Sequence, residues 1–231
     1  MTILAVTGLR REQRILATPD IEVLAGGGNA GRLAALLETH ARQAEGIISI
    51  GIAGALAPEL RPGNWIVATA VRDGEDSWPT DAAWRTRLAA LLPGAEEGVQ
   101  LGRDTMVARA VEKAALHRAT GAVGVDMESH LAARAARRHG LPFAVARVVS
   151  DGADRDLPVA AQRGMRPDGG VDISAVLRAL AADPRQLPAL IRTGWEAEKA
   201  FRALLGGHHR LGARLAASPI AASSAGDTGL V

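Results

Sequence analysis

The chain has 231 residues, 48% of them hydrophobic, and a formal net charge of +2. A chain of this length can bury one sizeable core, so we expect one α/β domain over residues 1–205 and a flexible C-terminal tail over residues 206–231. The absence of cysteine excludes disulfides and thiolate metal sites, and the balanced charge and scarce aromatic residues argue against nucleic-acid binding. With no signal peptide and no apolar run long enough to cross a bilayer, the expected location is the cytoplasm.

The chain begins with a predicted strand, a glycine turn and a basic helix. Residues 3–6 are apolar, Gly8 ends the strand, and the helix that follows carries Arg10, Arg11 and Arg14. Three arginines in a first turn oppose the helix dipole, which favours acidic side chains there. A bound anion would resolve this conflict, because the backbone N–H groups after Gly8 and the guanidinium groups can both bind phosphate. A solvated basic face is the alternative interpretation.

Strands and helices alternate through the middle of the chain. Strands are predicted at residues 21–24, 47–50, 65–71 and 99–101, and helices at residues 31–42, 81–92 and 107–118. Asn29 is the expected N-cap of the first of these helices. Residues 26–28 are a glycine run without the spacing of a dinucleotide fingerprint, so they predict a tight turn. Residues 51–55 are small enough for the backbone to approach a ligand, and residues 73–80 predict a surface excursion.

The segment at residues 123–151 carries two carboxylates that the fold should bring together. Glu128 lies at the head of a predicted helix that Gly140 ends, and Asp151 follows a mostly apolar strand over residues 143–149. Ligand sites of α/β proteins form at the ends of such elements. We therefore expect Glu128 and Asp151 to share one site.

The C-terminal third is predicted to contain a long loop and two helices. Residues 154–172 are rich in Asp, Arg, Pro and Gly, which indicates a loop that could act as a mobile lid. The second helix, over residues 187–205, carries its apolar side chains on one stripe. This stripe can pack on the sheet, on another subunit or on a membrane surface.

Three blocks of the sequence resemble one enzyme superfamily. The glycine-rich block at residues 47–67, the sequence V-D-M-E-S at 125–129 and V-V-S-D at 148–151 resemble motifs of the purine nucleoside phosphorylase and methylthioadenosine/S-adenosylhomocysteine nucleosidase superfamily, in the same order and with similar spacing. The resemblance covers roughly residues 3–155. It implies a three-layer α/β fold of the nucleoside phosphorylase type, with a mixed central sheet flanked by helices.

Two further segments are similar to one branch of that superfamily. G-L-R-R-E-Q-R at residues 8–14 and D-P-R-Q-L-P-A-L-I-R at residues 183–192 look most like the hopanoid-associated phosphorylases. Those enzymes are assigned to cleaving adenine from adenosylhopane. The resemblance therefore implies a lipid-linked adenine nucleoside as substrate.

The superfamily implies a role for each matching residue. Asp151 would protonate N7 of the departing purine, with Ser150 and Val125 beside the base, while Glu128 would bind the ribose hydroxyls and Met127 would pack on the sugar. For Asp151 to act as a general acid it must be protonated at neutral pH, which its apolar strand should favour. The expected phosphate or water site comprises Gly8, Arg10, Arg11, Glu12, Gln13, Arg14, Gly51 and Ile52. No metal or cofactor is expected, and inorganic phosphate is an expected co-substrate.

The sequence departs from the superfamily at three positions. Gln13 aligns with the glutamate that positions water in the hydrolytic members, with Glu12 one step away, which favours phosphate over water. Ile52 replaces a serine or threonine that contacts the nucleophile. Ala119 aligns near the aromatic residue that stacks on the base, which predicts a roomier and more apolar pocket.

The predicted function is cleavage of the purine N-glycosidic bond of adenosylhopane, giving adenine and a ribosyl or phosphoribosyl hopane. A methylthioadenosine/S-adenosylhomocysteine hydrolase is the alternative within the same class, and a non-catalytic nucleoside-binding protein is the alternative outside it. The expected partners are a small-molecule or lipid-linked nucleoside, a membrane surface in peripheral contact, and further copies of the chain in a homodimer or higher homo-oligomer. No nucleic acid is expected.

Overall fold

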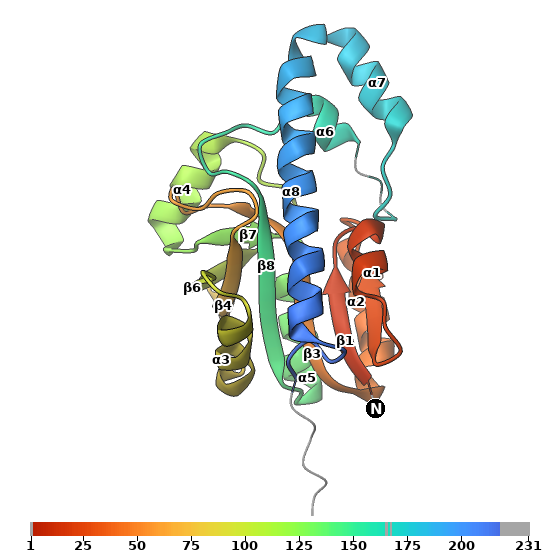
Figure 1. The fold of residues 1–231 in the computed structure, drawn as a ribbon, viewed down its shortest axis with the longest axis vertical. Helices are drawn as coiled ribbons and strands as arrows, with labels where there is room; N and C mark the ends of the chain where they lie inside the picture. The colour runs from red at the N-terminus through yellow and green to blue at the C-terminus, as the bar shows by residue number, and fades with distance from the viewer. Residues whose placement is uncertain (1, 165, 167, 218–231) are drawn as a thin grey trace, which may run out of the picture.

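A mixed sheet of eight strands forms the centre of the computed structural model, which describes residues 2–217 except 165 and 167 (Figure 1). The strands are β1 (Thr2–Thr7), β2 (Ile21–Ala25), β3 (Ala44–Ala55), β4 (Trp65–Asp73), β5 (Asp76–Pro79), β6 (Glu96–Gly102), β7 (Gly124–Asp126) and β8 (Phe143–Asp151). The predicted strands are all present, and β3 and β6 are longer than expected, because β3 continues through the glycine-rich residues 51–55 and β6 begins at Glu96.

The strand order brings distant parts of the chain to one edge. β2, β1, β3 and β8 run parallel, so the segments after β1, β3 and β8 leave the sheet on the same side. β8 then pairs antiparallel with β4, β4 pairs with β6, and β6 pairs with β7. β7 returns to the end of β3 through the pairs Gly54–Val125 and Ala55–Gly124. The carboxyl end of β7 therefore lies beside those of β1, β3 and β8.

Helices cover both faces of the sheet, as predicted for a three-layer α/β fold. The helices are α1 (Arg10–Leu16), α2 (Ala30–His40), α3 (Ala82–Leu91), α4 (Ala110–Thr120), α5 (Ser129–His139), α6 (Val159–Arg163), α7 (Ile173–Ala182) and α8 (Leu187–Leu211), with short 3-10 turns at Ala41–Gln43 and Pro184–Gln186. One hydrophobic core joins one face of the sheet to α1, α3 and α8, and a second joins the other face to α2 and α5. None of the described helices is long and apolar enough to cross a membrane.

The predicted surface excursion at residues 73–80 is a β-hairpin instead. β5 pairs antiparallel with β4 across a tight turn at Gly74, and Trp78 is buried against the core. The Asp73-Gly74 pair is a hairpin signal, and Trp78 supplies the apolar contact that fixes the register.

The predicted domain boundary at residue 205 is wrong, because α8 continues to Leu211 and the chain packs as far as the described residues extend. Leu211 and Leu215 are buried, and the Trp84 indole donates to the Leu215 carbonyl at 2.8 Å. Gly207 lies inside this helix because the Trp65 ring occupies the space of a side chain, with a Cβ there only 2.2 Å from the ring. Residues 218–231 of the predicted tail lie outside the described residues.

The predicted long loop at residues 154–172 contains a helix and is tied to the start of the chain. α6 occupies Val159–Arg163, and the Arg10 N–H donates to the Gly169 carbonyl at 3.0 Å. Beyond it, α7 and the first half of α8 project past the sheet as an antiparallel pair (Figure 1). We call residues 171–195 the α7–α8 hairpin. Six of its large apolar side chains are exposed, namely Val171, Ile173, Leu177, Leu187, Ile191 and Trp195.

Candidate active site

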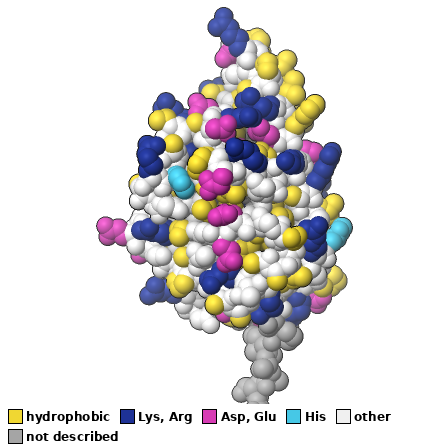
Figure 2. Space-filling model, turned by 60° about the vertical axis from the view of Figure 1, so that its left-hand side comes forward, with side chains coloured by type: hydrophobic (Ala, Val, Ile, Leu, Met, Phe, Trp, Pro, Cys, Tyr) yellow, Lys and Arg dark blue, Asp and Glu magenta, His cyan; other side chains and the backbone are white. Residues whose placement is uncertain are grey.

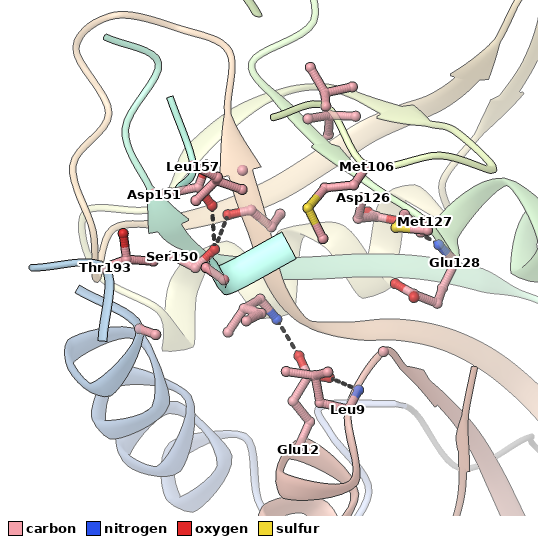
Figure 3. A pocket seen from close by; sticks show the side chains of 18 of the residues that line it. Leu9, Glu12, Met106, Asp126, Met127, Glu128, Ser150, Asp151, Leu157 and Thr193 are labelled. Carbon is pink, nitrogen blue, oxygen red and sulfur yellow. Dashed lines mark hydrogen bonds between the residues drawn. The ribbon is translucent and has the colours of Figure 1, made fainter. Parts of the chain in front are cut away.

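A pocket lies at the edge of the sheet where β1, β3, β7 and β8 end (Figure 3). Its walls come from these strand ends, from the loop before α4, and from α6 and α8. The lining residues are Gly8, Leu9, Glu12, Ile52, Ala53, Gly54, Thr105, Met106, Val107, Val125, Asp126, Met127, Glu128, Ser150, Asp151, Leu157, Ala161, Thr193 and Ala197. Three carboxylates that the sequence associates with chemistry, on Glu12, Glu128 and Asp151, thus face one space.

Glu128 is held at the pocket wall while its neighbour Asp126 caps the helix. Glu128 is the N-cap residue of α5, but its own side chain makes no capping bond. The Asp126 carboxylate accepts from the Glu128 and Ser129 N–H groups at 2.9 and 2.7 Å instead. The Glu128 carboxylate is therefore available to the pocket, and it lies opposite Gly8, where an added Cβ would be 3.1 Å from it.

Arg147 stands behind Glu128 as a buried counter-charge. Its guanidinium is fully buried and lies 3.2 Å from Asp126 and 3.5 Å from Glu128, and it donates to the Ser49 hydroxyl at 2.5 Å. Burial nevertheless raises the pKa of Glu128 to about 8, against the opposing effect of Arg147 and with further upward shifts from Asp126 and Glu12. Glu128 is thus largely protonated at neutral pH.

Glu12 is the carboxylate that bridges the first turn and the glycine loop. One oxygen accepts from the Leu9 N–H at 2.5 Å and the other from the Ile52 N–H at 2.6 Å. Burial raises the pKa of Glu12, with Arg147 and these backbone N–H groups acting in the opposite direction. Gly51 is required beside it, because a Cβ there would lie 2.3 Å from the Glu12 carboxylate.

Asp151 lies at the end of β8 between a hydroxyl and an ammonium. The Ser150 hydroxyl is 2.7 Å from one carboxylate oxygen, and Nζ of Lys113 is 2.5 Å from the other. The apolar strand therefore does not surround Asp151 in the way that we expected. A buried cation on α4 reaches it instead.

The arginines and the glutamine of the first helical turn do not reach the pocket. Arg10 pairs with Asp168, Arg11 pairs with Glu198 and stacks on Phe201, and Arg14 is exposed. Gln13 donates to the Val23 carbonyl at 2.9 Å, on the other side of the helix. The prediction that Arg10, Arg11 and Arg14 converge on an anion is therefore wrong, because carboxylates and an aromatic ring outside the pocket take up Arg10 and Arg11.

Of the predicted site residues, the pocket gathers Gly8, Glu12, Ile52, Val125, Met127, Glu128, Ser150 and Asp151. Gly51 lies directly behind Glu12 without lining the pocket. Ala119 is exposed on α4 and is not part of the wall, so its predicted place beside the base is wrong. Met106 and Val107, from the loop before α4, line the pocket instead, and Met106 lies near Met127 (Figure 3).

Sequence reasoning missed Lys113 as a site residue and did not assign Arg147 a role. A signal for Lys113 was present, because only two of the 27 lysine and arginine residues are lysines. Arg147 was the one charged residue in an otherwise apolar strand, which is a local conflict of the kind that marks functional positions. Among the described residues, no group of His, Cys, Asp and Glu side chains could hold a metal ion.

The arrangement separates three chemical tasks. Glu12 can accept a proton from a bound molecule, Glu128 can hydrogen-bond hydroxyl groups, and Asp151 can exchange a proton with a leaving group. The wall between them is largely apolar, which strengthens each electrostatic interaction. Such a pocket suits the cleavage of a bond between a polyhydroxylated ring and a basic leaving group.

Comparison with known proteins identifies the family of this chain. The family model of the phosphorylase superfamily matches residues 23–182. A comparison with the curated proteins finds no match. Among solved structures, 5′-methylthioadenosine/S-adenosylhomocysteine nucleosidase from Neisseria meningitidis, in complex with methylthio-immucillin-A, is similar with a TM-score of 0.66 and 13% identity over 93% of this chain and 97% of that one.

Two other solved structures have the same fold. The Streptococcus pneumoniae nucleosidase in complex with 8-aminoadenine gives a TM-score of 0.61 at 18% identity, over 79% of this chain and 98% of that one. Futalosine hydrolase of Helicobacter pylori gives 0.62 at 15% identity, over 90% and 97%. The family match spans well over half of the chain, so this protein belongs to the phosphorylase superfamily and is an enzyme of the nucleoside phosphorylase or nucleosidase type.

Proposed function

We propose that this enzyme hydrolyses the N-glycosidic bond of a 5′-substituted adenine nucleoside and releases adenine. The observation that carries the proposal is the meeting of Glu12, Glu128 and Asp151 in one largely apolar pocket. A binding protein would need contacts to the sugar and the base, but it would not need two further carboxylates placed for proton transfer. This argues against the non-catalytic alternative.

In the proposed reaction the bond between C1′ of the ribose and N9 of the purine breaks, and its electron pair stays on the purine. Asp151 gives its proton to N7, so the purine leaves as a neutral molecule. The oxygen of a water molecule bonds to C1′, and the proton that this water loses goes to Glu12. General acid and general base assistance of this kind is worth about 10²–10⁴-fold in rate for each group.

Water is the proposed nucleophile because Glu12, and not an arginine, faces the pocket from the first turn. The backbone N–H groups of Leu9 and Ile52 fix both oxygens of the carboxylate, so it can orient a small molecule with little reorganisation. An ionised Glu12 would repel a phosphate dianion, and no arginine is among the lining residues. Inorganic phosphate as co-substrate is the alternative.

The helical wall of the pocket favours an apolar 5′ substituent. Leu157 and Ala161, together with Thr193 and Ala197 of α8, give this wall little polarity. We propose that the substituent is a hydrocarbon, and adenosylhopane is the nucleoside of that class which the resemblance to hopanoid-associated enzymes implies. Two of the solved neighbours are named as methylthioadenosine/S-adenosylhomocysteine nucleosidases, so the short methylthio group is the rival substituent.

The α7–α8 hairpin is the proposed contact with the membrane that holds such a substrate. Trp195 is 78% exposed, two positions from Thr193 in the pocket wall. The exposed side chains of Arg178, Arg185 and Arg192 lie among the apolar ones, and Figure 2 shows hydrophobic and basic side chains mixed on this projecting end. Apolar side chains mixed with arginines are typical of a surface that binds anionic lipid.

Adenine release tests the reaction and the substrate class together. Adenosine, methylthioadenosine and 5′-alkyl adenosines of increasing chain length should be incubated with and without inorganic phosphate. We expect adenine without phosphate, and a lower KM for the longer alkyl chains. Absence of adenine from every nucleoside would contradict the reaction. A preference for methylthioadenosine over every longer analogue would contradict the hydrocarbon substituent and leave the reaction in place.

Flotation with vesicles tests the membrane contact. The protein should float with vesicles rich in phosphatidylglycerol and less with pure phosphatidylcholine, and Trp195→Ser with Ile191→Ser should abolish flotation. A second copy of the chain is the other occupant that such a face could bind. If the double variant dissociates a dimer in analytical ultracentrifugation and the wild type does not float, the hairpin is a subunit interface and the membrane contact is wrong.

A further inference from the structure

Lys113 is a fully buried cation whose side chain ends at the carboxylate of Asp151. Its Nζ lies 2.5 Å from Oδ2 of Asp151, and it also donates to the carbonyl oxygens of Gly152 at 2.8 Å and Arg155 at 3.2 Å. The side chain of Lys113 has no exposed surface, while that of Asp151 is 10% exposed, on its pocket side. Lys113 therefore touches the proposed acid from behind and does not itself line the pocket.

The three contacts match the three donors of an ammonium group. A neutral amine has only two hydrogens and would turn its lone pair towards one of the three oxygens, whereas an ammonium satisfies all three. The two carbonyl bonds also partly replace the hydration that burial removes. The geometry is therefore that of a charged lysine held in a fixed place.

The identity of the residue supports this interpretation. Lysine occurs only twice in a chain that otherwise uses arginine for its strong bases. A compact ammonium can face three converging acceptors, whereas a planar guanidinium presents its donors in a rigid fork. The other lysine, Lys199, is exposed on α8, so it offers a matched control.

We propose that Lys113 is a positioning residue for Asp151. Its ammonium fixes one carboxylate oxygen of Asp151 and stabilises the negative charge that Asp151 acquires when it gives its proton to the leaving purine. This inference rests on the proposed function. The C1′–N9 bond breaks, the electron pair goes to the purine, the proton moves from Asp151 to N7, and the ammonium of Lys113 keeps all its protons. Lys113 contributes a fixed charge in a water-poor site, which acts most strongly in the transition state.

The other charged groups in this corner are placed differently. Arg155 pairs with Glu196 at 2.7 Å near the surface, Asp154 is exposed, Asp156 accepts from the Ala110 N–H at the start of α4, and His117 contacts the Ala122 carbonyl. Across the pocket lie Glu12, Asp126, Glu128 and Arg147. Of the described ionisable side chains, Lys113 alone makes a hydrogen bond or ion pair to Asp151.

The first test compares Lys113→Met with Lys199→Met on a nucleoside that the wild type cleaves. We expect Lys113→Met to lower kcat about 10- to 100-fold with KM within about threefold, because the lost interaction is made mainly in the transition state. Lys199→Met should match the wild type in kcat and KM.

The second test asks whether Lys113 acts through Asp151. In an Asp151→Asn background, Lys113→Met should cause little further loss of kcat, because the charge to be stabilised no longer forms. Equal losses in both backgrounds would overturn the proposal and leave Lys113 a structural residue. Lys113→Arg keeps the charge, so its kcat should lie between those of the wild type and Lys113→Met. A kcat no higher than that of Lys113→Met would count against a role of the charge.

The outcomes separate this inference from the proposed function. If the wild type releases no adenine from any nucleoside, the proposed function fails. If the wild type is active and Lys113→Met keeps its kcat, only the role of Lys113 fails. Thermal unfolding of each variant shows whether a loss of kcat comes from a folded enzyme.

Discussion

The two halves of the pocket are built in different ways. On the sheet side, Glu12, Glu128 and Asp151 are buried. Backbone N–H groups donate to Glu12, Arg147 lies beside Glu128, and Lys113 pairs with Asp151. On the helical side, small and apolar residues of α6 and α8 lead to a hairpin with large exposed apolar side chains. The difference indicates that the sheet side determines the reaction and that the helical side determines which substituent the substrate carries.

If this division holds, the largest effect should come from Glu12. Glu12→Gln removes the proposed base but keeps the size of the side chain, so kcat should fall by about 10³-fold. Steady-state kinetics of adenine release measure this, with Gln13→Ala as the matched control that should stay close to the wild type. A larger loss in the Gln13 variant would mean that the first turn faces the substrate in the register that the sequence alignment suggested.

Asp151→Asn should have the next largest effect on the sheet side. The amide cannot supply the proton to N7, so kcat should fall by about 10²-fold or more while KM stays nearly unchanged. The same kinetics measure both constants. Wild-type turnover in this variant would show that the purine leaves without help from this side chain.

A change on the helical side should affect binding only. Trp195→Ala should raise KM for a long-chain 5′-alkyl adenosine roughly 5- to 10-fold, which corresponds to about 1–1.4 kcal/mol of lost apolar contact. Its kcat, and the KM for methylthioadenosine, should not change. Val111→Ala, at an exposed apolar position on α4, is the control. A loss of kcat in the Trp195 variant would break the division between the two halves.

The last effect concerns the pH dependence of the free energy of unfolding. Burial raises the pKa of Glu128 from 4.5 to about 8, so the folded protein holds a proton that the unfolded chain releases between these values. The free energy of unfolding therefore falls as the pH rises through this window. Glu128→Gln has no group that ionises in this window, so it should not lose this free energy of unfolding. Its melting temperature should exceed that of the wild type at pH 8 by roughly 2–4 °C for each kcal/mol of difference in the free energy of unfolding, and by less at pH 5.

Thermal unfolding at the two pH values measures this difference. The variant should at the same time lose activity, because the ribose contact is gone. A melting temperature that falls at pH 8 relative to pH 5 by the same amount in both proteins would show that another group causes the pH dependence.

Local signals made much of the site predictable. Glu128 and Asp151 each follow a clear element boundary, and the structure places both where the chain order suggested. Glu12 was harder to assign, because successive residues of a helix point about 100° apart and the sequence does not fix where the first turn begins. One residue of slip exchanges Glu12 for Gln13, and the structure resolves it through the Ile52 N–H, 40 positions away.

Contacts between distant segments explain the predictions that failed. Lys113 contacts Asp151, which lies 38 positions further along the chain. Arg10 and Arg11 turn outward because they pair with Asp168 and Glu198, which are also distant in the sequence. The tail was predicted to begin at residue 206, yet Gly207 lies inside α8, where the Trp65 ring occupies the space of a side chain. Local sequence patterns do not contain such pairings.

The most direct test of the account is the identity of the sugar product when phosphate is available. Phosphorus NMR of a reaction that contains excess inorganic phosphate and a 5′-alkyl adenosine would show any sugar 1-phosphate directly. Because Glu12 faces the pocket and the arginines do not, we expect adenine and a free 5′-substituted ribose, with the phosphate signal unchanged and the rate independent of phosphate. A sugar 1-phosphate formed in step with adenine would contradict the proposed role of Glu12 and make the enzyme a phosphorylase.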